Sequence, residues 1–157
     1  MKKTKDLCLC GIIAALYVAM TLANPISWSF LQFRISNLLC AIPFFNKKTT
    51  PGILIGIAIA NMFSPIGIVD VVFGVSAEAI AYLVTVWGPA KKLHWLFKGA
   101  ILSASVGLVI GAELHLVYGS PLTLSIVSLF ISTFAIASLG CLLIKFGIPK
   151  SWHQFDS

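Results

Sequence analysis

Long apolar runs alternate with short polar breaks along the whole chain. Charged residues, prolines and glycines mark the breaks, and the runs between them carry few charges. About 20 helical residues cross the roughly 30 Å hydrocarbon layer of a bilayer, and most of the runs approach that length. The pattern predicts an all-α membrane protein, a single compact domain over residues 1–157 whose six transmembrane helices run over about 7–23, 30–46, 51–63, 70–87, 99–117 and 121–144.

The second of these helices is the hardest to place from the sequence. The apolar run from Ile35 to Asn46 has too few residues to span a bilayer. The helix therefore either begins near Phe30, with Arg34 in its first turns, or stops short of spanning. The first helix has a clearer end at Asn24, because the residue before a proline is biased away from helix.

The N-terminus has some features of a secretory signal peptide. Three lysines precede an apolar stretch, and Thr21-Leu22-Ala23 has the small residues of a cleavage site. The apolar stretch from Leu7 to Ala23 is longer than the roughly 7 to 15 residues of a signal-peptide core. We therefore expect a first helix that is retained in the membrane.

Composition supports the membrane prediction. Of 157 residues, 59% are hydrophobic and 10% are charged, which lies outside the usual range of soluble domains. The net charge of +6 is compatible with a nucleic-acid partner, but the lysines form short clusters between apolar runs, so no nucleic acid is expected. The four cysteines lack the spacing of a zinc site, and we expect inert packing residues and no metal.

Charge distribution predicts the topology, because short cytoplasmic loops of membrane proteins collect lysine and arginine. With the N-terminus in the cytoplasm, all lysines fall on cytoplasmic segments: Lys2, Lys3, Lys5, Lys47, Lys48, Lys91, Lys92, Lys98, Lys145 and Lys150. The outer connections at about 24–33, 64–70 and 118–120 have none. Six helices return the C-terminus to the cytoplasm, and only Arg34, the single arginine, lies on the outer side.

Five ionisable residues remain within or beside the predicted spans: Arg34, Asp70, Glu78, Glu113 and His115. Helix rise places Glu78 about 12 Å below the outer start of its helix and Glu113 about 22 Å above Lys98, so both reach the outer half of the membrane. An ionised side chain near the bilayer centre costs at least about 2.5 to 3.5 kcal/mol, so such residues normally face the bundle interior and find partners there.

These residues predict a pocket on the extracellular side for a small polar or cationic molecule with a flat ring. Asp70, Gly74 and Glu78 follow one helical stripe, and Asn61 supplies an amide near mid-membrane. The candidate binding residues are Gln32, Arg34, Asn37, Asn61, Asp70, Phe73, Glu78, Glu113, His115 and Trp28. Alternatively, the charges only neutralise each other as polar contacts between helices, Arg34 with Asp70 or Glu78 and Glu113 with His115. Trp28 also suits an interfacial aromatic belt.

No catalytic motif is present in the sequence. The chain has no Gly-x-x-x-x-Gly-Lys-Ser/Thr phosphate loop, so it cannot hydrolyse ATP itself. It also has no Gly-x-Ser-x-Gly or His-Glu-x-x-His motif. We therefore expect a protein that is not an enzyme and that holds no cofactor of its own.

The first predicted helix carries a stripe of small residues, Gly11, Ala15, Ala19 and Ala23, at four-residue steps. Such a stripe lets another helix approach closely. It serves either packing within the bundle or the docking of a partner.

Several short runs, in order along most of the chain, resemble the substrate-binding (S) components of energy-coupling factor (ECF) transporters, and among these the QueT group. The runs are Ala15-Leu-Tyr-Val-Ala19, Gln32-Phe-Arg-Ile-Ser36, Pro51-Gly52, Asn61-Met-Phe-Ser-Pro-Ile-Gly67, Asp70-Val-Val-Phe-Gly74 and Gly111-Ala-Glu-Leu114.

The resemblance implies a subunit of a vitamin-type ABC importer in the bacterial plasma membrane. Its Ala-x-x-x-Ala motif would dock on a transmembrane T component, and two cytoplasmic ATPase subunits would bind ATP and Mg. The ligand would be a 7-deazaguanine queuosine precursor such as preQ1. A carboxylate can accept two hydrogen bonds from its guanine-type edge and another can pair its aminomethyl cation, roles that suit Glu78 and Glu113.

Two positions depart from the pattern of the group. Asn37 follows Arg-Ile-Ser where the group usually has glutamate, and residues 121–144 contain no acid. The exact ligand is therefore open, and another vitamin-like molecule is an alternative. A second alternative is a self-sufficient proton-coupled transporter that uses Glu78 or Glu113, and a third is a structural subunit.

Overall fold

The computed structural model describes residues 2–24, 27 and 33–147. Within these ranges the chain is helical and has no β-strand, as predicted. The α-helices are α1 (Lys2–Ala23), α2 (Thr50–Asn61), α3 (Ile68–Tyr82), α4 (Trp95–Tyr118) and α5 (Leu122–Gly147). The shorter elements are the 3₁₀ helices η1 (Ile35–Phe44), η2 (Lys47–Thr49) and η4 (Pro89–Lys92), and the π-helical segment η3 (Leu83–Trp87) that continues α3.

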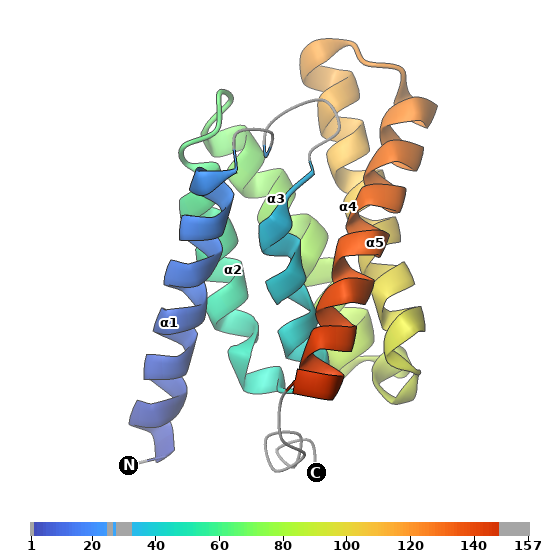
Figure 1. Cartoon of the computed structure of the whole chain (residues 1–157). Coiled ribbons are helices and arrows are strands. Elements are labelled where there is room, and N and C mark those ends of the chain that lie inside the picture. The colour runs from blue at the N-terminus through green and yellow to red at the C-terminus, as the bar shows by residue number, and fades with distance from the viewer. Residues whose placement is uncertain (1, 25–26, 28–32, 148–157) are drawn as a thin grey trace.

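The helices form a closed ring in chain order. Each of α1 to α5 packs against the next, and η1, cyan in Figure 1, packs against both α5 and α1. The start of α1 and the end of α5 lie at the same end of the bundle, at the bottom of Figure 1. This arrangement agrees with an even number of helices. The cytoplasmic position of that end stays a prediction.

Four helical segments in the described part of the chain are long and apolar enough to cross a membrane: Lys3–Ala23, Ile68–Trp87, Trp95–Tyr118 and Leu122–Gly147. They match the predicted spans within a few residues. The helix α2 has 12 residues and η1 has 10, so both are shorter than a full span.

The second helix differs from its predicted range of 30–46. It begins at Ile35, and Arg34 precedes it with an extended backbone (φ −96°, ψ 107°), so Arg34 does not lie in its first turns. The carbonyl of Phe33 accepts a 2.6 Å hydrogen bond from the side chain of Asn24. This oxygen is therefore satisfied outside a helix. Residues 30–32 lie outside the described part.

Glycines allow the closest helix contacts. A Cβ atom at Gly52 would lie 2.7 Å from the carbonyl oxygen of Cys10 on α1, and one at Gly140 on α5 would overlap the carbonyl oxygen of Leu38 on η1. These contacts bring α2 and η1 into the ring. The buried core between the helices is mainly apolar, and its largest members include Tyr17, Ile53 and Tyr82.

Candidate functional site

A buried polar cluster centres on the guanidinium group of Arg34. Its Nε donates a 3.0 Å hydrogen bond to the carbonyl oxygen of Ser27, and its Nη1 donates a 2.8 Å bond to Oδ1 of Asn61. Its Nη2 lies 3.5 Å from Oδ2 of Asp70, and both side chains of this ion pair are buried. Because the backbone of Arg34 is extended just before η1, one side chain joins the loop after α1 to α2 and α3.

Asn61, at the end of α2, fixes the second half of this cluster. It is fully buried, and its Nδ2 donates a 2.9 Å hydrogen bond to the backbone carbonyl of Asp70. A Cβ atom at Gly74 would overlap the same nitrogen, so the glycine makes room for the amide. The spacing of Asp70 and Gly74 along α3 thus positions both an acid and the gap that Asn61 occupies.

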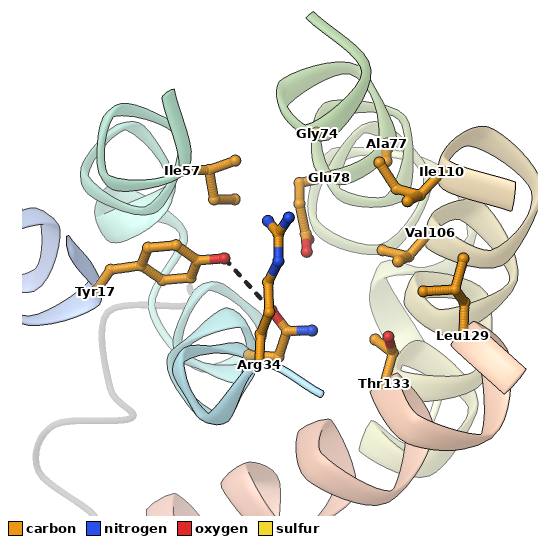
Figure 2. Close-up of a pocket in the computed structure, with 11 residues that line it drawn as sticks. Tyr17, Arg34, Ile57, Gly74, Ala77, Glu78, Val106, Ile110, Leu129 and Thr133 are labelled. Carbon is orange, nitrogen blue, oxygen red and sulfur yellow. Dashed lines mark hydrogen bonds between the residues drawn. The ribbon is translucent and has the colours of Figure 1, made fainter. Parts of the chain in front are cut away.

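A narrow cavity lies beside this cluster (Figure 2). It is lined by Tyr17, Arg34, Asn37, Ile57, Gly74, Ala77, Glu78, Val106, Ile110, Leu129 and Thr133. Its volume is about 20 Å³, which is room for about one water molecule. Figure 2 shows the polar groups of Tyr17, Arg34 and Glu78 on one side, and the apolar side chains of α4 and α5 on the other.

Tyr17 and Thr133 line this cavity although the sequence did not single them out. Both are buried, and the hydroxyl group of Tyr17 donates a 3.4 Å hydrogen bond to Oδ1 of Asn37. A signal for Tyr17 was available: it is two residues from both Ala15 and Ala19, and so lies on the opposite face of the helix from the small stripe.

Three buried carboxyl groups carry oxygens with no hydrogen-bond partner among the described residues. They are Oδ1 of Asp70, Oε2 of Glu78 and both oxygens of Glu113. Buried polar atoms are nearly always hydrogen-bonded in proteins, so these oxygens are candidates for ligand contacts. Of the three acids only Glu78 lines the cavity; Asp70 and Glu113 are not among its lining residues. Arg34 forms its ion pair with Asp70, and neither Glu78 nor Glu113 forms an ion pair among the described residues.

Of the remaining candidate residues, only Phe73 packs beside the cavity within the described part of the chain. Phe73 is half-buried and packs against the apolar cluster of α3, α4 and α5 that forms one wall of the cavity. His115 is exposed, and its Nδ1 lies 2.8 Å from the carbonyl oxygen of Ser120. The proposed pairing of Glu113 with His115 was wrong, because neither oxygen of Glu113 has a hydrogen-bond partner among the described residues, His115 included. Trp28 and Gln32 lie outside the described residues.

The small stripe of α1 faces outward. Gly11, Ala15, Ala19 and Ala23 are all exposed. Most of the stripe lines an apolar groove together with Ala14, Val18, Leu22, Ile55 and Ile59. The close contact between α1 and α2 is made instead by glycines of α2, so the stripe is left open.

Comparisons with known proteins agree with these features. A family model described as "QueT transporter" matches residues 7–147. The chain is 31% identical over 162 residues to "Queuosine precursor transporter QueT" of Lactococcus lactis subsp. cremoris (strain MG1363), an alignment that covers 89% of this chain and 96% of that protein. No solved structure matches significantly.

Proposed function

The chain belongs to the QueT transporter family, and we propose that it is the membrane-embedded S component of an ECF-type importer, which captures a 7-deazaguanine queuosine precursor. It is a multi-pass protein of the cell membrane and a transporter by family. We place its pocket on the extracellular side, because the described segments that carry lysines lie at the opposite end of the bundle, and short cytoplasmic segments of membrane proteins collect lysine.

The observation that carries this proposal is the excess of unsatisfied carboxylate oxygens around one arginine. A 7-deazaguanine presents an N1–H and a 2-amino group, which together match the two oxygens of a carboxylate. Glu78 or Glu113 would accept these donors, and the other would pair the aminomethyl cation of a preQ1-like ligand. Arg34 or Asn61 would donate to the ring carbonyl.

The ligand must widen the cavity, because about 20 Å³ is far less than a two-ring base fills. The polar wall is fixed by the hydrogen bonds of Arg34 and Asn61. The apolar wall of Val106, Ile110 and Leu129 has no such bonds through its side chains, so α4 and α5 are the elements that would move outward. Phe73 would then be available to stack on the ring.

Uptake would depend on partner subunits. The exposed stripe at Ala15 and Ala19 supports docking of a T component, since small residues let a partner helix approach closely. Two ATPase subunits, with their ATP and Mg, would supply the energy, because this sequence has no phosphate loop. The chain itself would act by binding and not by catalysis.

The test is to purify the protein from its host and identify what accompanies it. Mass spectrometry should detect a 7-deazaguanine in the denatured sample, and calorimetry on the emptied protein should give saturable binding of preQ1. A T component and ATPases should copurify. If the protein binds an unrelated small molecule and calorimetry detects no binding of any 7-deazaguanine, the proposed ligand is wrong. ATP-independent uptake by the isolated chain would overturn the ECF mechanism.

One observation favours a second candidate, a proton-coupled transporter. Glu113 is fully buried, and neither of its oxygens has a hydrogen-bond partner among the described residues, which suits a proton-binding site within a span. Uptake into liposomes that hold this chain alone, driven by a pH gradient and lost in Glu113→Gln, would support it over the S component.

A further inference from the structure

A second cavity, here called the basic cavity, opens at the lysine-bearing end of the bundle. Its charged lining is formed by four lysines, Lys47, Lys91, Lys92 and Lys98. Its volume is about 410 Å³, within the range of ligand pockets in proteins. Lys98 and Glu113 are fifteen residues apart on α4, or about 22 Å. The basic cavity is thus separate from the proposed substrate site.

The described charged residues that line this cavity are all positive. No carboxylate is among its described lining residues. The nearby Asp6 pairs with Lys48, which is not a lining residue, at 3.1 Å. Lys98 is buried, with 9% of its surface exposed, whereas the other three lysines are exposed. Lys47, Lys91 and Lys92 place three ammonium groups around one opening, and this arrangement favours an anion between them.

The rest of the lining is apolar, and tertiary contacts hold part of it in place. It consists of Pro43, Phe44 and Val86. Phe44 packs edge-on against the ring of Tyr82, with 6.1 Å between ring centroids, and the Tyr82 hydroxyl donates to the carbonyl of Cys40 at 2.9 Å. The cavity therefore offers cations at its mouth and a fixed hydrocarbon wall, a combination that suits an amphipathic anion better than an inorganic one.

The position of the basic cavity further limits the class of ligand that it can bind. The loop that carries Lys91 and Lys92 connects the spanning segments Ile68–Trp87 and Trp95–Tyr118, so it lies at a membrane boundary. Exposed apolar side chains flank it, including Trp87 and Phe97. We propose that the basic cavity binds the phosphate headgroup of an anionic phospholipid, with the acyl chains against these side chains. Basic pockets between membrane helices are suited to such headgroups.

The test compares lipids retained by the purified full chain. The protein is reconstituted in nanodiscs with equal phosphatidylglycerol and phosphatidylcholine, extracted in mild detergent and measured by native mass spectrometry. The wild type should retain phosphatidylglycerol preferentially. Lys91→Gln/Lys92→Gln should lower that preference by roughly tenfold or more, and Lys91→Arg/Lys92→Arg should keep it.

The matched control is Lys3→Gln/Lys5→Gln, which removes the same charge from exposed positions at the start of α1. It should keep the preference. Equal loss in both glutamine variants, or no preference in the wild type, would overturn the site. If millimolar inorganic phosphate displaces the lipid, the proposal of a phospholipid ligand is wrong and the cavity binds free phosphate. Equal melting temperatures of the four proteins check folding, and no readout depends on the transported substrate.

Discussion

Arg34 Nη1 donates a 2.8 Å hydrogen bond to Oδ1 of Asn61, and this bond joins the segment before η1 to the end of α2 across 27 positions of sequence. The amide of Asn61 continues the connection to the backbone of Asp70. The polar wall of the candidate site is thus one network in which Arg34 and Asn61 each have more than one partner. Such a network is expected to act in stability as well as in binding.

Asn61→Ala should destabilise the protein strongly. The change leaves Nη1 of Arg34 without its 2.8 Å hydrogen bond and removes one of the bonds to the carbonyl of Asp70, both in a buried region, and an unsatisfied buried donor costs about 1 to 3 kcal/mol. Thermal unfolding in detergent measures this loss. Asn46→Ala is the comparison, because its side chain makes one cap bond to the backbone of Lys48 and should cost about 1 kcal/mol. An equal decrease in the two variants would contradict the network.

Gly74→Ala should displace Asn61. The new methyl group would overlap the Asn61 side-chain nitrogen, so the amide must shift away from its bonds to Arg34 and Asp70. We expect lower ligand affinity together with a lower melting temperature. Gly11→Ala is the matched control on an exposed helix position with nothing within 4 Å, and should gain up to about 1 kcal/mol from helix propensity. Unchanged affinity in Gly74→Ala would contradict the arrangement.

Much of the fold and part of the site could be predicted from the sequence. Four of the six predicted spans followed from apolar length, whereas α2 and η1 are shorter than a full span. The clustering of Arg34, Asn61 and Asp70 followed because polar and charged side chains avoid lipid and gather inside a bundle. The open stripe of α1 was visible as a pattern, although its exposure was not. Its exposure could be predicted only by knowing that glycines of α2, and not the small residues of α1, make the close contact between the two helices.

The other features depend on tertiary contacts that no local pattern specifies. One such contact lies just before η1, where the side chain of Asn24 donates a hydrogen bond to the carbonyl of Phe33. The roles of Tyr17 and Thr133 depend on which face of each helix meets the cavity. Depth alone placed His115 near Glu113, but a two-residue step along a helix turns a side chain by about 200°, and His115 faces outward.

Glu113→Gln should separate binding from stability. Neither oxygen of Glu113 has a hydrogen-bond partner among the described residues, so replacing the carboxyl group with an amide breaks no hydrogen bond there and should leave the melting temperature unchanged or raised. Affinity for preQ1 should fall by roughly 10 to 100-fold if the carboxylate pairs a ligand donor. Glu78→Gln tests the second acid in the same assay. A large loss of stability without a change of affinity would assign Glu113 a structural role.

Asn37→Glu should alter the preference for ligand charge. Asn37 lines the cavity, and its Oδ1 accepts a hydrogen bond from Tyr17, so a carboxylate there would add a negative charge beside the ligand. The affinity for aminomethyl-bearing preQ1 relative to a neutral 7-deazaguanine should rise by roughly tenfold, as expected for a charge-assisted contact. Competition binding with the two ligands measures the ratio. Asn37→Gln, which keeps the amide, should leave the ratio as in the wild type.

Ala15→Leu should block assembly while leaving the subunit intact. Ala15 is exposed in the groove between α1 and α2, so a larger side chain costs little in the isolated protein but fills the space that a partner helix would enter. Copurification of a T component should be lost, whereas preQ1 affinity and melting temperature should stay unchanged. Ala15→Ser, which stays small, should assemble normally. Ala135→Leu makes the same substitution at an exposed position on α5 and should also assemble. Loss of assembly in both leucine variants would point to a general effect of surface bulk, and retention in both would exclude this groove as the docking surface.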